Sequence, residues 1–157
     1  MKLSPRSGPP PRTGPAIPHQ QLDQNAPVEL QEELWRRMSS LSDITTGPSG
    51  ISFADTRALH LRPESARPGA ERFLIGTEFA HLHGPADGSL HACLPYDVVA
   101  EVIEKGWGEL HPVARDGLRP TTLVMLFGPR DPDELEIIWQ LVQVSHDFAI
   151  TPARSDA

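Results

Sequence analysis

The chain has 157 residues with a formal net charge of −7, and 38% of its residues are hydrophobic. This length predicts one domain with its own core. The acidic charge and the lack of any long Lys/Arg run argue against nucleic acids and anionic membrane surfaces as partners, because both require a basic face. The single cysteine, Cys93, excludes an intrachain disulfide and indicates a reducing compartment. With no secretory leader and no run of about 20 apolar residues, the expectation is a soluble cytoplasmic protein without a membrane partner.

The first 26 residues differ in composition from the rest. They are rich in proline together with Gly, Ser and Gln, and they lack periodic apolar positions. Such a segment cannot bury enough surface to offset the entropy of ordering. The sequence therefore predicts a disordered proline-rich tail over residues 1–26, one domain over residues 27–150 and a flexible C-terminus over residues 151–157. A proline-rich partner motif at "PPPR" is a weaker interpretation.

Three segments have helical patterns. From Pro27 onward, Leu30, Leu34, Met38 and Leu41 form one apolar stripe. A second helix is expected in "PYDVVAEVIEKG", residues 95–106, with Pro95 in its first turn and Gly106 as its end. Its expected buried residues are Val98, Val99, Val102 and Ile103.

The third helix follows residue 130. In "DPDE", Asp131 is the expected cap, Pro132 the first helical residue and Glu134 the partner that completes a capping box. Its expected buried side consists of Leu135, Ile138, Leu141 and Val142.

Four segments have the composition of strands. Strands are expected within residues 51–61, 73–83 and 89–94, with an exposed loop over residues 62–72. The almost wholly apolar "TTLVMLFG", residues 121–128, predicts a central strand covered on both faces. Together these elements predict an α+β fold, in which a mainly antiparallel sheet is packed by about three helices.

The stretch "EFAHLHGPADGSLHACLP", residues 78–95, contains three of the seven histidines. A turn centred on residues 85–87 would place Ser89 opposite His83 and His91 opposite His81. Alternation then gives a core face of Ala80, Leu82, Leu90, Ala92 and Leu94. It gives a second face of Phe79, His81, His83, Ser89, His91 and Cys93, while Glu78 has the parity of the core face.

Clustered imidazoles suit three kinds of site. They can ligate a transition metal, transfer protons near neutral pH, or hydrogen-bond a polar planar ligand. A solvated sheet face without function is the alternative to all three. In "KGWGELHP", residues 105–112, the side chains of Trp107, Glu109 and His111 alternate, so they could share one side of an extended segment. A carboxylate beside an imidazole can set its tautomer and raise its basicity. A Trp such as Trp107 is more often a core residue than a ligand platform, and the Glu109–His111 pair could be solvated.

The ordered motifs "EFAHLH", "DGSLH", "GWGELHP" and "GPRDPDE" resemble those of the luciferase-domain family, named for the fungal luciferase of luminous mushrooms. The resemblance covers roughly residues 50–148. It implies an α+β fold and, for the fungal members, oxygen-dependent oxidation of a hydroxylated pyrone without an organic cofactor. The motif residues in this chain are Glu78, His81, His83, Asp87, Ser89, His91, Trp107, Glu109 and His111.

These observations together lead to one functional hypothesis. The chain is expected to be a bacterial, oxygen-dependent oxidoreductase, or a related enzyme of the luciferase-like monooxygenase or dioxygenase type, that acts with O₂ on a small planar pyrone or phenol. The expected catalytic residues are His81, His83, His91, Glu109 and His111. The expected substrate-binding residues are Glu78, Asp87, Ser89 and Trp107. A transition metal, if bound, would be held by His81, His83 and His91, and the alternative is a non-catalytic module that binds a small molecule or a protein.

Overall fold

The computed structural model describes residues 1–151. The flexible C-terminus expected over residues 151–157 therefore lies, apart from Thr151, outside the described residues. The elements follow one another as α1 (Val28–Met38), β1 (Ile44–Pro48), β2 (Arg57–Leu61), β3 (Glu78–Leu82), β4 (Leu90–Cys93), α2 (Tyr96–Glu104), β5 (Gly108–Leu110), α3 (Pro112–Arg115), β6 (Leu123–Leu126) and α4 (Pro132–Ala149). Two short 3₁₀ turns, Pro63–Ser65 and Ala70–Arg72, lie in the loop after β2.

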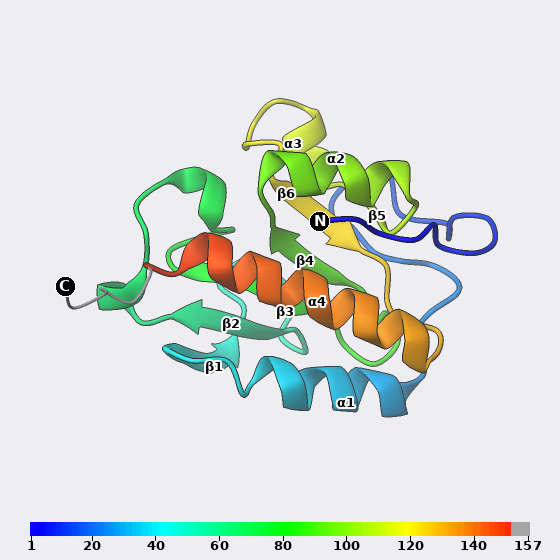
Figure 1. The fold of residues 1–157 in the computed structure, drawn as a ribbon, viewed down its shortest axis with the longest axis horizontal. Helices are drawn as coiled ribbons and strands as arrows, with labels where there is room; N and C mark the ends of the chain where they lie inside the picture. Colours follow the sequence, from blue (N-terminus) through cyan, green and yellow to red (C-terminus); the bar gives the residue numbers. More distant parts are fainter. Residues whose placement is uncertain (152–157) are drawn as a thin grey trace.

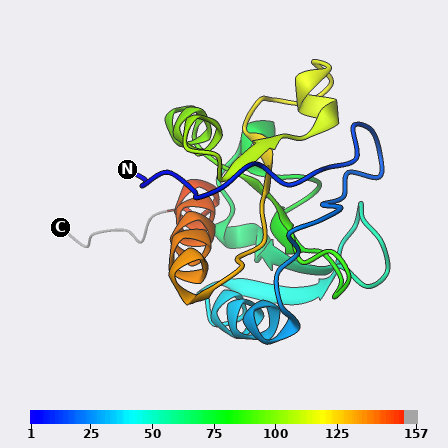
Figure 2. The ribbon, with the colours of Figure 1, turned by 90° about the vertical axis from the view of Figure 1, so that its right-hand side faces the viewer.

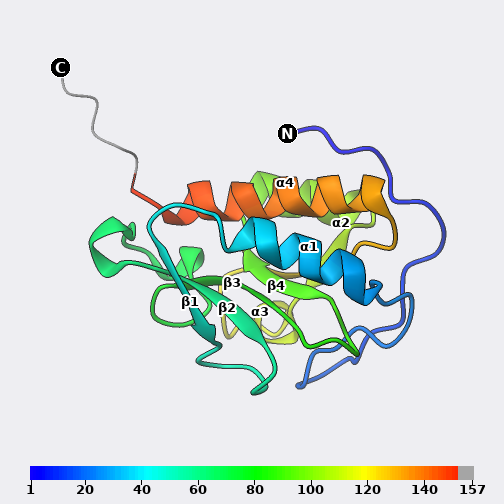
Figure 3. The same ribbon diagram turned by 90° about the horizontal axis from the view of Figure 1, so that it is seen from below.

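The six strands form one antiparallel sheet in the order β1-β2-β3-β4-β6-β5. Helices α1, α2 and α4 lie together on one face of it (Figures 1 and 3). This arrangement confirms the predicted α+β class. Strand β6 lies between two neighbours and is buried throughout, as its apolar sequence predicted. Strands β1 and β5 and the short helix α3 were not predicted as separate elements.

The hydrophobic core lies between the three long helices and the sheet. The five residues predicted for the core face of the hairpin all belong to it, as do the four predicted for α4. Helix α2 differs in one position, because Ile103 is 44% exposed. The other three predicted residues, Val98, Val99 and Val102, are buried and belong to the core. In "DPDE", Asp131 does cap α4, since its side chain accepts a hydrogen bond from the Glu134 amide. The Glu134 carboxylate, however, accepts from the Arg130 amide and guanidinium rather than completing a capping box.

A β-bulge explains where two residues differ from simple alternation. Strand β3 pairs Ala80 with Leu59 but Glu78 with His60, so Phe79 has no partner of its own on β2. Because of this extra residue, the side chains that precede the bulge in β3 point to the opposite face of the sheet from that expected by simple alternation. Phe79 therefore lies in the core beside His146 of α4, not on the histidine face as predicted. Glu78 turns to the histidine face, where its carboxylate meets His81.

Residues 1–26 are placed against the domain, where the sequence predicted a disordered tail. Leu3 is buried in the core, the Trp107 indole donates to the Ser4 carbonyl oxygen, and the Arg6 amide donates to Lys105. Figure 2 shows this segment, in blue, passing across the molecule from the side of α4. It follows the β5 edge and reaches the sheet face that carries no long helix, where His19 contacts His91. The segment is held by hydrogen bonds and a few buried side chains rather than by a helix or strand. Its packing could therefore not be predicted from composition or from periodic apolar positions.

Candidate functional site

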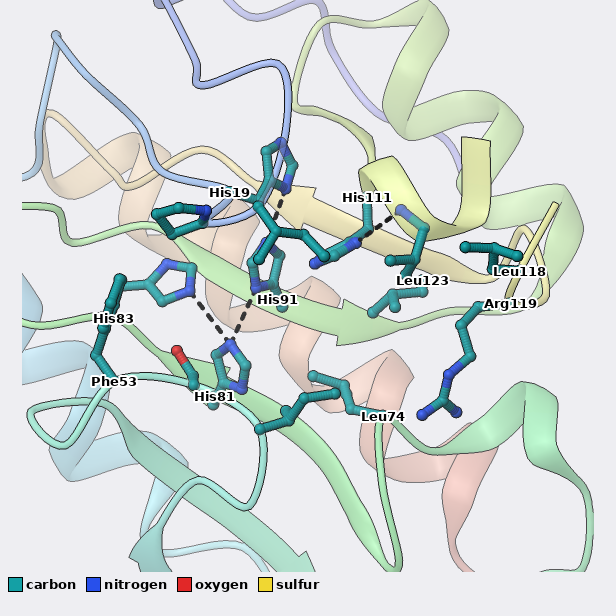
Figure 4. A pocket seen from close by; sticks show the side chains of 15 residues that line it. His19, Phe53, Leu74, His81, His83, His91, His111, Leu118, Arg119 and Leu123 are labelled. Atoms are coloured by element: carbon teal, nitrogen blue, oxygen red, sulfur yellow. Dashed lines mark hydrogen bonds between the residues drawn. The ribbon is translucent and has the colours of Figure 1, made fainter. Parts of the chain in front are cut away.

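A cavity of about 410 Å³ opens on the sheet face opposite the long helices. Five histidines line it, and Figure 4 shows them gathered around His91. The remaining walls are mostly apolar and include Phe53, Leu74, Leu118 and Leu123, with Arg119 as the cation among the described lining residues. Pockets of this size with apolar walls and a few convergent polar groups are typical of small-molecule sites.

The hairpin register brings His81 and His91 together. The two residues are direct partners on β3 and β4, as predicted, and the His83 amide donates to the Ser89 carbonyl oxygen. The turn between the strands needs Gly88, which has a positive φ of 75° and no room for a Cβ beside Gln31. As a result, one nitrogen each of His81, His83 and His91 can lie within 4.8 Å of the others.

A relay from Asp87 fixes the tautomer of His83. The Ser89 hydroxyl donates to the Asp87 carboxylate, and the Ser89 oxygen lies 2.9 Å from Nδ1 of His83. Because that hydroxyl hydrogen is already used, His83 must be the donor in the second contact. The proton of neutral His83 is therefore on Nδ1, and Nε2 carries a lone pair.

The same reasoning applies to His81. Its Nδ1 lies 2.7 Å from the Glu78 carboxylate, an acceptor that requires a proton on Nδ1. Glu78 is fully buried, and it also accepts from the Gly50 amide and the Ser49 hydroxyl. Burial opposes its ionisation, but these hydrogen bonds and that from His81 outweigh burial and hold the pKa of Glu78 below its usual value. In neutral His81, Nε2 therefore carries a lone pair, and it lies 3.2 Å from Nε2 of His83.

A third chain of contacts leads outward from His91. Its Nδ1 lies 3.0 Å from Nε2 of His81, and its Nε2 lies 2.9 Å from Nδ1 of His19. Nε2 of His19 lies 2.8 Å from the Glu109 carboxylate, so it carries the proton of neutral His19. Nδ1 of His19 is then an acceptor, and His91 donates to it from Nε2. Neutral His91 consequently directs a third lone pair, on Nδ1, toward His81.

The surroundings keep His83, His91 and His111 neutral. Burial, helped by the neighbouring imidazoles, lowers the pKa of His83 to about 3 and that of His91 well below its usual value. Burial and the neighbouring histidines likewise lower the pKa of His111 to about 4. Neutral imidazoles can accept hydrogen bonds or ligate metals.

His111 differs from the other histidines. It is the cap of α3, and its Nδ1 accepts a hydrogen bond from the Val113 amide. The proton of the neutral ring is therefore on Nε2, which makes His111 a donor at the cavity wall rather than an acceptor.

The structure separates the predicted site residues into three groups. His81, His83, His91 and His111 line the cavity. The second group forms hydrogen bonds that orient the histidine rings, and it consists of Glu78, Asp87, Ser89 and Glu109. The first three of these were predicted to bind substrate. Trp107 lies in the core and contacts the N-terminal segment, so it does not share a face with Glu109.

Sequence reasoning missed the contribution of His19 and of the cavity walls. His19 lies among prolines in a segment that carried no strand or helix pattern, and its only signal was that it is a histidine. Arg119 and Phe53 lie in loops, where no periodicity marks the side chain that will face a cavity.

None of the helices in the described part of the chain combines the length and apolarity needed to cross a bilayer.

Comparisons with known proteins agree with the motifs. Residues 76–145 match a family model described as "Luciferase domain". The luciferase of Armillaria gallica is 36% identical over 70 residues, and that of Neonothopanus nambi is 37% identical over 70 residues. Each match covers 43% of this chain and 26% of the fungal protein, so the chain spans about a quarter of those relatives. No solved structure matches significantly.

The matched segment runs from just before β3 into the last turns of α4. It includes the three converging histidines and His111, but not His19. Residues 76–145 are therefore similar to the luciferase-domain family, as their motifs indicated.

Proposed function

We propose that the histidine-lined cavity is the active site of an oxygen-dependent oxidoreductase that acts on a small planar hydroxylated molecule, such as a hydroxypyrone or a phenol. The observation that carries this proposal is one cavity that combines mostly apolar walls with a cluster of converging imidazoles. A planar ring would contact Phe53, Leu74 and Leu123, while its hydroxyl groups would meet the imidazoles. The similarity of residues 76–145 to fungal luciferases supports oxidation over simple binding.

The groups around the cavity suit particular steps. An imidazole lone pair accepts the hydroxyl proton, and the oxyanion left behind passes one electron to O₂. The substrate radical and superoxide then combine through a new carbon–oxygen bond, and the peroxide anion takes a proton back from the imidazolium. The Nε2–H of His111 and the Arg119 guanidinium would stabilise negative charge on the substrate oxygens. In this scheme Glu78, Asp87, Ser89 and Glu109 orient the rings and do not touch the substrate.

Oxygen uptake by the purified chain tests the proposal. We expect consumption of O₂ with at least one member of a panel of hydroxypyrones and catechols, and loss of that activity in His91→Gln. The control is His60→Ala, because His60 is bonded to the Pro48 carbonyl oxygen outside the cavity. If panel members raise the melting temperature of the chain but none supports oxygen uptake, oxidation is ruled out for them and a binding module is favoured.

A further inference from the structure

In their neutral forms, the rings of His81, His83 and His91 direct three lone pairs toward one another. Nε2 of His81 lies 3.2 Å from Nε2 of His83 and 3.0 Å from Nδ1 of His91. The opposite nitrogen of each ring is a donor, to Glu78, to Ser89 and to His19 respectively. Buried polar atoms are normally paired, and three converging acceptors repel each other unless something electron-poor lies among them.

The geometry points to a transition-metal site at which Nε2 of His81, Nε2 of His83 and Nδ1 of His91 bind one divalent ion. Metal–nitrogen bonds of about 2.0–2.1 Å at tetrahedral angles place ligand nitrogens roughly 3.3–3.4 Å apart. The two separations above are close to this value. Three histidines with an open fourth position are a recognised arrangement of catalytic metal sites.

The outer partners support this assignment independently. Metal-binding histidines usually donate their other N–H to a carboxylate or a carbonyl, which fixes the tautomer and the ring orientation. Here each ring is connected to a carboxylate: His81 directly to Glu78, His83 through the Ser89 hydroxyl to Asp87, and His91 through His19 to Glu109. With a metal ion among the three lone pairs, every nitrogen of these four rings has a partner.

The neighbouring histidine set does not share these properties. His19, His91 and His111 also have nitrogens within 4.8 Å of one another. However, the lone pair of His111 is occupied by the Val113 amide, and His19 uses both nitrogens on His91 and Glu109. The inference is therefore one ion at His81, His83 and His91, with the cavity on its open side.

Calorimetric titration of chelator-treated protein with Zn²⁺, together with metal analysis of the dialysed complex, tests the inference without a substrate. The inference rests on the proposed function and refines it, because a bound ion would occupy the lone pairs and would itself lower the pKa of a bound hydroxyl in place of an imidazole base. The two can fail separately because metal content and oxygen uptake are measured independently. We expect one Zn²⁺ per chain. Single His81→Ala, His83→Ala and His91→Ala changes should each cost more affinity than the roughly 10–100-fold loss expected for Glu78→Gln and Asp87→Asn.

Two histidine variants serve as controls. His60→Ala and His111→Ala should keep the affinity of the unmodified chain, because neither ring offers a lone pair to the ion. Circular dichroism of each variant shows whether it is folded. A folded unmodified chain that takes up no Zn²⁺ would overturn the inference regardless of how the variants behave, and so would an equal loss in His111→Ala and His81→Ala.

Discussion

Nε2 of His83 lies 3.2 Å from Nε2 of His81, and each ring donates from Nδ1 to a different acid-linked partner, so both Nε2 atoms carry lone pairs when the rings are neutral. Each of these two neighbouring histidines is thus oriented by a different carboxylate. Glu78 on β3 accepts from His81, and Asp87 in the turn is linked to His83 through Ser89.

Replacement of Ser89 by alanine should destabilise the protein. Ser89 is buried, and its oxygen is the acceptor for Nδ1 of His83 while its hydroxyl satisfies Asp87. An orphaned buried group costs about 1–3 kcal/mol, so urea unfolding should show a loss of that size. Ser40→Ala is the matched control, because that exposed hydroxyl bonds only to the nearby Arg37 carbonyl oxygen. Equal effects of the two changes would contradict the relay.

Deletion of residues 1–26 should lower the melting temperature by several degrees, since about 1 kcal/mol shifts a domain of this size by roughly 2–8 °C. The deletion removes buried Leu3 and His19, and also the acceptors of Trp107 and Arg130. A melting temperature within a degree of the full chain would show that the segment is dispensable.

A point-variant pair tests the same packing without truncation. Leu3→Ala should be destabilising because its side chain lies in the core, whereas Lys2→Ala alters an exposed neighbour and should stay within about 0.5 kcal/mol.

Leu141→Ala should cost about 2–5 kcal/mol in chemical unfolding, because the side chain is fully buried between α4 and the sheet. Gln143 is exposed on the same helix, so Gln143→Ala is the control for helix propensity. A cost below about half a kcal/mol at Leu141 would place it outside the core.

The Arg130–Glu134 pair predicts a pH dependence. Burial raises the pKa of Glu134, but hydrogen bonds from the Arg130 guanidinium and amide outweigh burial and hold that pKa below its usual value. A carboxyl group whose pKa is lower in the folded protein than in the unfolded chain stabilises the fold at pH values above the unfolded-chain pKa of about 4.3. This stabilisation is lost as the pH falls through the pKa of the folded protein. The difference in unfolding free energy between the unmodified chain and Glu134→Gln should therefore be largest near neutral pH and shrink below about pH 4. A difference that is constant with pH would contradict the charged pair.

The parts of this fold that could be predicted are those with strong local patterns. The register of His81 opposite His91 followed from alternation and turn residues, and the buried side of α4 followed from helical spacing. The position of Glu78 could not, because a bulge depends on pairing with β2 rather than on the sequence of β3 alone. Trp107 lies in the core, which is the alternative that its large aromatic side chain favoured over substrate binding.

The candidate site was predicted only in part for a related reason. The hairpin histidines are close in sequence, so their meeting was visible in the motif. His19 reaches them from 72 residues away through a segment held by side chains of distant elements. Such tertiary contacts leave no periodic signal, and the roles of Ser89, Asp87 and Glu109 as outer partners become evident only from the hydrogen-bond network.

The most direct test of the metal site is a crystal structure of the Zn²⁺-treated protein, measured with X-rays at the zinc absorption edge. We predict one anomalous peak at about 2.0–2.1 Å from Nε2 of His81, Nε2 of His83 and Nδ1 of His91. The hydrogen bonds from these rings to Glu78, Ser89 and His19 should be intact. A peak coordinated by His111, or an ordered cluster with no peak among its three lone pairs, would contradict the site.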